Sequence, residues 1–213
     1  MNDSSNEDHD AWHKYILKTI ERLRTYVDIT KSKSLLRRYF VMNAFDGTMT
    51  SLGIIIGAYI SHISHPEVIV SVKIVGGIAM AISGFTGTYM TESAERANTL
   101  NELEDSMLTD LFDSIHGDAS RYMSFFAALI DGSAPFLASL PSLLPFILSI
   151  FGFIPVYFAY FASVMIDLTI LFLLGVFLGR ISKRNAVYSG LKMIIAGIIV
   201  AGLALLIHGG FEA

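Results

Sequence analysis

The chain has 213 residues, of which 53% are hydrophobic and 16% are charged, and its formal net charge is −4. Because soluble domains carry roughly 25% charged residues, this composition predicts a membrane protein rather than a soluble domain. The chain has no cysteine, which excludes disulfides, thiolate metal sites and iron–sulfur clusters. No basic patch indicates nucleic-acid binding, and no catalytic or nucleotide-binding motif is present, so we do not expect an enzyme.

Residues 1–38 are polar and charged and are predicted to form a cytoplasmic N-terminal segment. Over residues 9–38, apolar side chains such as Trp12, Ile16 and Ile20 recur every three or four positions, which predicts an amphipathic helix. Such a helix either lies on the membrane surface or docks on the rest of the protein. The periodicity is compatible with both placements.

Five apolar segments follow, each with the length of a membrane-spanning helix, about 20 residues or more. They cover residues 39–63, 68–91, 122–144, 147–179 and 187–208. The fourth segment is too long for one straight helix, so we expect its first part to be a loop or a helix end around Pro145 and Pro155. Pro135 and Pro141 predict a kinked or broken helix in the third segment.

The distribution of basic residues predicts how these helices are oriented. Lysines and arginines precede the first span and separate the fourth from the fifth, whereas the connections at 64–67 and 145–146 have none. By the positive-inside rule we expect a multi-pass protein of the cell membrane with a cytoplasmic N-terminus. The predicted order is transmembrane helices 1 and 2 in 39–91, a cytoplasmic acidic helical segment in 92–120, transmembrane helices 3 to 5 in 121–208 and a tail at 209–213.

The first span carries one formal charge, Asp46, in a row of polar and small residues. Asn43, Asp46, Thr50, Gly53 and Gly57 follow helical spacing and share one seam. A carboxylate near mid-span costs roughly 2.5–3.5 kcal/mol on insertion scales, so such residues usually have a function. The seam therefore predicts a helix that lines an ion path. The alternative is a buried, hydrogen-bonded structural acid.

The second span has a similar seam of small residues that includes Met80. Two such seams allow helices to approach closely, so Met80 would face the same interface as Asp46. A carboxylate together with a thioether suits Fe²⁺ better than Mg²⁺ or Ca²⁺, which prefer all-oxygen ligands. As an alternative, Met80 is a gap-filling core residue.

Acidic residues follow the second span on a predicted helix. Glu92, Glu95 and Glu102 fall on one face of it, beside an apolar stripe. This ridge could collect cations at the mouth of the path or pack against a partner. Alternatively it is a solvated acidic face, which Arg96 in its middle favours.

Two further acids lie at membrane depth in the third and fourth spans. Asp131 precedes Gly132 and Pro135, which would free backbone carbonyls, and Asp167 has no basic residue within one turn. Each is either a proton-relay or metal-facing group, or a packing acid bonded to a serine or threonine hydroxyl.

Three stretches of the chain resemble the vacuolar iron transporter family. They are FDGTMTSLG at 45–53, Ala79-Met80-Ala81, and GSAPFLASLPSLLPF at 132–146. The resemblance implies a homodimer that moves Fe²⁺, and often Mn²⁺, out of the cytosol in exchange for protons. It also implies that Asp46 and Met80 line the path and that the acidic segment is a metal-binding region. The family's Gly-Glu-Tyr pattern is replaced here by Ser83-Gly84-Phe85, so its second-span glutamate is missing.

These observations predict an all-α, five-span homodimer that exports Fe²⁺, with Mn²⁺ as a further substrate, by H⁺ antiport. Asp46 and Met80 would coordinate the metal in transit, with Asn43, Thr50 and Asp131 as further path residues. Glu92, Glu95 and Glu102 would capture the metal on the cytoplasmic side. The partners are the lipid bilayer and the transported metal, with no resident cofactor. The alternatives are a membrane scaffold that docks a soluble partner, and a proton-coupled exporter of another small solute.

Overall fold

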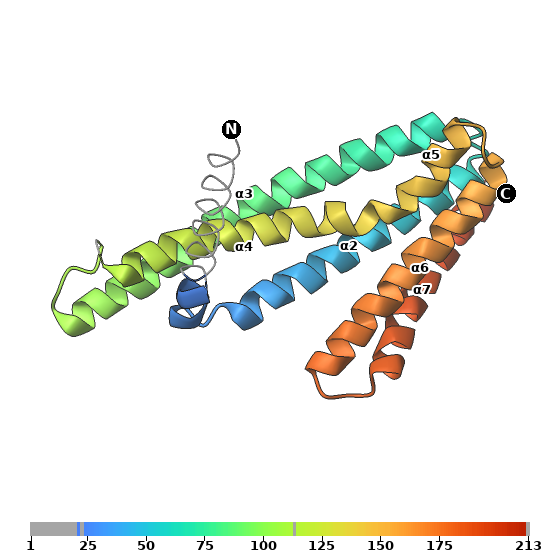
Figure 1. The fold of residues 1–213 in the computed structure, drawn as a ribbon. Coiled ribbons are helices and arrows are strands. Elements are labelled where there is room, and N and C mark those ends of the chain that lie inside the picture. The colour runs from blue at the N-terminus through green and yellow to red at the C-terminus, as the bar shows by residue number, and fades with distance from the viewer. Residues whose placement is uncertain (1–20, 22–23, 113, 212–213) are drawn as a thin grey trace, which may run out of the picture. The chain divides into compact units, whose positions relative to one another are not determined.

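The computed structural model describes residues 21, 24–112 and 114–211, and it is 87% helical with no strand in that part of the chain (Figure 1). The helices are α2 (Lys33–Ile60), α3 (Pro66–Met107), α4 (Ile115–Ser139), the 3₁₀ helix η1 (Pro141–Leu143), α5 (Leu144–Ile150), α6 (Val156–Ile181) and α7 (Ala186–Phe211). The predicted helix over residues 9–20 lies outside the described residues. The all-α prediction is thus confirmed.

The amphipathic helix does not run unbroken to residue 38. Residues 24–29 are helical, a turn follows at 30–32, and Lys31 has a positive φ of 51°. The Thr30 hydroxyl donates to the Tyr26 carbonyl at 2.7 Å and lies 2.6 Å from the Ser32 hydroxyl. Such local side-chain bonds compete with the helix and favour a turn. As a result, the first apolar helix begins at Lys33 instead of residue 39.

Within the described residues, five helical stretches are long and apolar enough to cross a membrane. They are Lys33–Ile60, Pro66–Met107, Ile115–Ile150, Val156–Ile181 and Ala186–Ala204. The third is broken at Pro141, as predicted, because η1 begins there, whereas α4 continues through Pro135. The start of the predicted fourth segment, 147–150, belongs to α5, and the chain then turns before α6.

The acidic residues after the second span continue the same helix, since α3 runs without interruption to Met107. The chain divides into two compact units. The first comprises Met1–Arg37 and Thr88–Ala128, and the second comprises Arg38–Gly87 and Leu129–Ala213. In the first unit, α3 is followed by the non-helical residues 108–112, and α4 begins at Ile115.

The core of the second unit lies where α2, α5 and α6 meet. Ile55, Phe146 and Ala159 are completely buried there, and the rings of Phe146 and Tyr160 pack edge to face at 5.2 Å. The Tyr160 hydroxyl donates to the Ile63 carbonyl at 2.8 Å. This bond ties the N-terminal end of α6 to the chain just after α2.

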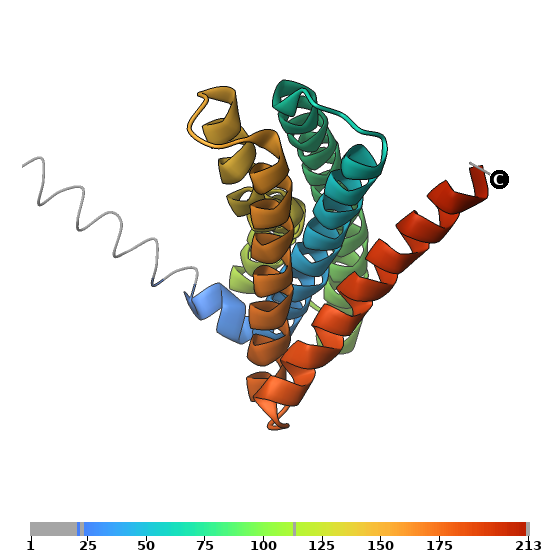
Figure 2. The ribbon, with the colours of Figure 1, turned by 90° about the vertical axis from the view of Figure 1, so that its right-hand side faces the viewer.

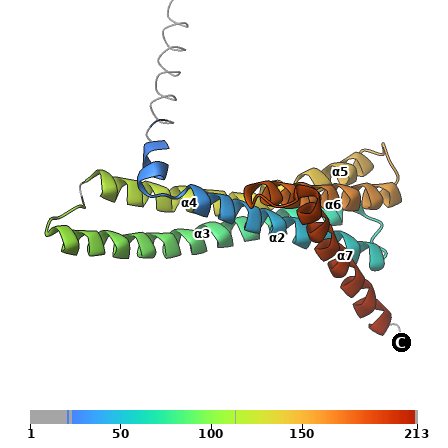
Figure 3. The ribbon, with the colours of Figure 1, turned by 90° about the horizontal axis from the view of Figure 1, so that it is seen from below.

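Helices α6 and α7 form a hairpin whose close contact depends on glycines. A Cβ atom on Gly175 would lie 2.6 Å from the backbone of Gly190, and one on Gly179 would lie 2.7 Å from Ala186. Small residues allow helices to pack this closely in membranes. Beyond this crossing, α7 diverges from α6 towards its C-terminal end (Figures 2 and 3).

Candidate functional site

Asn43 and Asp131, two of the predicted path residues, are in direct contact. The Asn43 amide donates to Oδ1 of Asp131 and also to the Tyr39 carbonyl, at 3.0 Å. Asp131 is buried. The contact requires α2 and α4 to approach closely, which Gly47 permits, because a Cβ atom at this position would lie 2.6 Å from the carbonyl carbon of Pro135. Two segments of the predicted path therefore meet at this point.

Asp131 also reaches α3. Its Oδ2 would lie 3.3 Å from a Cβ atom added to Gly84, so the missing side chain at position 84 leaves room for this carboxylate. A Cβ on Gly132 would meet the Ala81 carbonyl at 2.5 Å, which shows how closely α3 and α4 approach. Helices α2, α3 and α4 thus converge around one buried acid.

Asp46 lies one helical turn beyond Asn43 and is exposed, as is Thr50. Gly53 and Gly57 continue the same seam, and no heavy atom lies within 4 Å of a Cβ atom built on either one. At Asp46, Gly53 and Gly57 this seam therefore faces away from the core of the second unit, whereas Asn43 faces Asp131. The surface is polar at Asp46 and flat at the two glycines.

Met80 and Thr50 line one small hollow between α2 and α3, which also touches Lys73 and Ser51. Its volume is about 10 Å³, close to the least space that holds one water molecule. Asp46 is not among the described residues that line it. The structure thus brings Met80 to Thr50, one turn from Asp46 on α2.

A buried polar network connects α3 to α6 next to this hollow. The Lys73 ammonium group donates to Oγ of Ser142 at 2.6 Å. The hydroxyls of Ser142 and Ser51 lie 3.1 Å apart, and the Ser51 hydroxyl donates to Oδ2 of Asp167 at 2.7 Å. Lys73 is 4% exposed and Asp167 0%. Within the described residues, Oδ1 of Asp167 is buried without a hydrogen-bond partner.

The break after α4 positions the central serine of this network. Because Pro141 starts η1, Ser142 lies in a tight turn, where its hydroxyl also donates to the Ser139 carbonyl at 3.0 Å. The Ser163 hydroxyl of α6 donates to the Ser142 carbonyl at 2.8 Å. The irregular backbone is thereby held against α6, with its polar groups satisfied inside the protein.

Lys73 is absent from the predicted site residues, although a lysine within the apolar segment 68–91 is itself a signal of function. For Asp167, the bond to a serine hydroxyl that one of the two alternatives required is present, because the Ser51 hydroxyl donates to its carboxylate. The partners could not be read from spacing, because Ser142 is 69 residues from Lys73 and Ser51 is 116 residues from Asp167.

The predicted capture residues Glu92, Glu95 and Glu102 lie on the part of α3 that belongs to the first unit. The Glu92 carboxylate is buried and accepts a bond from Arg96 at 3.0 Å. Glu95 is exposed, and Glu102 accepts a bond from Asn98 at 2.9 Å. Since Glu102 lies two turns beyond Glu95, the three carboxylates do not converge. The capture role stays a prediction.

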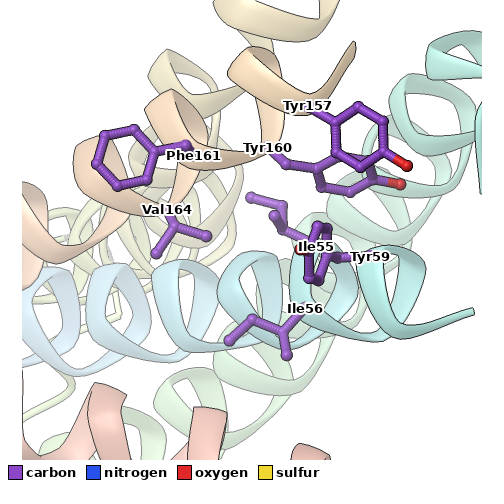
Figure 4. A pocket seen from close by; sticks show the side chains of 7 residues that line it. All are labelled: Ile55, Ile56, Tyr59, Tyr157, Tyr160, Phe161 and Val164. Atoms are coloured by element: carbon purple, nitrogen blue, oxygen red, sulfur yellow. The ribbon is translucent and has the colours of Figure 1, made fainter. Parts of the chain in front are cut away.

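Within the described residues, no three acidic or histidine side chains are grouped so that they could hold a metal ion. An apolar hollow of about 390 Å³ in the second unit is bordered by α2 and α6 (Figure 4). It is lined by Ile55, Ile56, Tyr59, Tyr157, Tyr160, Phe161 and Val164. This lining has no carboxylate or imidazole and is unsuited to a cation.

No family model matches the chain. It is 33% identical over 177 residues to the uncharacterized protein MJ0645 of Methanocaldococcus jannaschii, and the alignment covers 82% of this chain and 89% of that protein. Identity at this level over most of both chains indicates a common fold. The name of the relative assigns it no activity, ligand or partner. The chain therefore belongs to the same protein family as this protein of M. jannaschii.

Proposed function

We propose that the protein is a homodimeric, multi-pass membrane transporter that exports Fe²⁺, and also Mn²⁺, from the cytosol in exchange for protons. The observation that carries this proposal is the position of Asp46. It is exposed on a seam of α2 that faces away from the core of its own chain. A carboxylate at membrane depth faces protein or water rather than lipid. A second copy packed on this seam would provide that environment.

The flat part of the seam supports the same arrangement. The space next to Gly53 and Gly57 is open, so another helix can approach their backbones directly. In a twofold dimer the same surface of both copies forms the interface, which brings two Asp46 carboxylates towards one axis. Two carboxylates at one axis would offer a metal more oxygen ligands than the Asp46 of one copy alone.

Asp131 supports an acidic path despite the missing second-span glutamate. Its carboxylate lies beside Gly84, the position at which the vacuolar iron transporter family has that glutamate. An acid from α4 would thus supply the charge that α3 does not. Met80, one turn before Gly84 on α3, adds a thioether suited to a transition metal. These features favour a metal over a purely organic substrate.

Lys73 favours a second candidate, the proton-coupled export of another small solute. Its ammonium group lines the same hollow as Met80. A fixed positive charge in a poorly solvated place opposes a divalent cation. Under this alternative Asp46 carries protons only, and the transported solute is not a metal.

The test is transport by purified protein in liposomes with an inward pH gradient, using Fe²⁺ under reducing conditions and Mn²⁺. Asp46→Asn keeps the shape of the side chain and removes the charge that binds the metal, so we expect metal flux to be abolished in a protein that still folds. Glu67→Gln, at an exposed acid in the first turn of α3, is the matched control and should transport normally. Unchanged flux in Asp46→Asn would refute the proposed path. A folded dimer that moves neither metal would shift the assignment to the second candidate.

A further inference from the structure

We propose that Lys73, Ser142, Ser51 and Asp167 form a buried proton relay, in which a proton passes between the lysine amine and the aspartate carboxyl group through the two hydroxyls. Every link of the chain is a hydrogen bond of 2.6–3.1 Å. The four residues come from α3, η1, α2 and α6. This assignment extends beyond transport of a metal, because it names a separate site for the exchanged proton.

The hydrogen bonds run in a single direction when the Ser142 hydroxyl proton points at Ser51 instead of the Ser139 carbonyl. An ammonium group can only donate, so Lys73 donates to Ser142. The Ser51 hydroxyl has one proton and gives it to Asp167 at 2.7 Å. It is then an acceptor towards Ser142, which completes a chain of donors from the lysine to the carboxylate.

The transfer leaves both serines unchanged. One N–H proton of Lys73 moves to Oγ of Ser142 as the hydroxyl proton of Ser142 moves to Oγ of Ser51. The hydroxyl proton of Ser51 moves to Oδ2 of Asp167 in the same step. The ammonium and carboxylate become a neutral amine and a carboxylic acid, and each serine again has one proton.

Ser142 can connect or interrupt the relay by rotating its hydroxyl. The Ser139 carbonyl lies 3.0 Å from its oxygen, and the Ser51 hydroxyl lies 3.1 Å away. With the proton directed at Ser51 the chain is continuous, and with the proton directed at Ser139 it is broken. Two acceptors at nearly equal distance make this an easily reversed choice.

Among the described residues, the hydrogen bonds of this network involve no charged side chain other than Lys73 and Asp167. Lys73 comes from α3 and Asp167 from α6, while α2, α4 and η1 contribute serine hydroxyls and the Ser139 carbonyl. Next to this network, α7 packs against α6 through Gly197, which has no titratable group. A proton within the network is therefore shared by one amine and one carboxyl group.

The relay sets the charge at the hollow that Lys73 shares with Met80 and Thr50. When the proton resides on Lys73, an arriving cation is repelled. When it resides on Asp167, the hollow is lined by a neutral amine. Metal entry would therefore move the proton to Asp167, a coupling that rests on the proposed metal transport, whereas the relay itself does not.

The experiment is rapid-mixing infrared spectroscopy of the full-length protein in lipid, following the carboxylic-acid C=O band after a pH jump. We expect a band that responds to pH and disappears in Asp167→Asn. Ser142→Ala removes a link and should slow the response about 100-fold, the scale of a lost proton-transfer group. Ser142→Thr retains the hydroxyl and should respond as wild type. Ser124→Ala, which removes a buried hydroxyl bonded to the Ser120 carbonyl within α4, is the control and should also respond normally.

Absence of an Asp167 band at every pH at which the protein stays folded would overturn the relay, since the charges would then be fixed. A response in Ser142→Ala as fast as in wild type would overturn it as well. If Ser142→Ala does not fold, Ser51→Ala breaks the next link and serves the same purpose. Mixing with Mn²⁺ at constant pH tests the coupling separately. A band that responds to pH but not to Mn²⁺ supports the relay and contradicts its link to metal transport.

Discussion

Gly47 offers a direct test of how α2 meets α4. A Cβ atom at this position would lie 2.6 Å from the carbonyl carbon of Pro135, against an ordinary contact of 3.4–4 Å. Gly47→Ala therefore forces the two backbones apart by about 1 Å. Backbone shifts of this kind cost typically about 1–3 kcal/mol. The shift would also pull Asn43 from Asp131 and leave a buried carboxylate without that donor, which costs about 1–3 kcal/mol more.

The free energy of unfolding can be measured in mixed micelles by titration with a denaturing detergent, with circular dichroism as the signal. We expect Gly47→Ala to be less stable than wild type by about 2–6 kcal/mol, the combined range of the two costs. Gly202→Ala on α7 is the control, because nothing lies within 4 Å of its added Cβ and it is outside the α2 seam. Alanine has a higher helix propensity than glycine, so the free energy of unfolding of this control should be unchanged or should rise by up to about 1 kcal/mol. Equal stability of Gly47→Ala and wild type would refute the close packing of α2 on α4.

Two further predictions concern the dimer and the first unit. If the seam of α2 forms the dimer interface, Gly57→Cys in this cysteine-free chain should form a disulfide-linked dimer on oxidation, seen by non-reducing electrophoresis. Arg96→Gln should destabilise the protein by about 3–5 kcal/mol in the same unfolding titration, because it removes the guanidinium group that pairs with the buried Glu92 carboxylate.

Each of these two variants has a control at a comparable position. Ala58→Cys, next to Gly57 but in the core, should give no cross-linked dimer, and a monomeric Gly57→Cys after oxidation would contradict the proposed interface. Arg121→Gln breaks the pair with Asp118, in which both side chains are about half exposed, and should cost less than about 1 kcal/mol. Equal effects of Arg96→Gln and Arg121→Gln would mean that burial of Glu92 does not matter.

The fold class was accessible from composition, because long apolar runs with few charges favour helices that satisfy their own backbone in a membrane. The residues at which the helices begin and end were harder to predict from the sequence. The turn at 30–32 depends on the Thr30 side chain, which bonds locally in competition with the helix. Pro135 is tolerated within α4, whereas the chain breaks at Pro141, where serine hydroxyls satisfy the irregular backbone.

By itself the sequence determined which residues are costly in a bilayer, since the charge of Asp46, Asp131 and Asp167 is a local property. The sequence also shows a lysine, Lys73, within an apolar segment, but its role could be understood only from its partners in the structure. Only the tertiary structure decided which acid meets which group, because Asn43–Asp131 and Ser51–Asp167 join segments 88 and 116 residues apart. Helical periodicity specifies the face on which a residue lies. The packing of α2, α3, α4 and α6 determines what that face meets, and this packing places Asp46 on the surface and Asp167 at the end of a buried chain of hydroxyls.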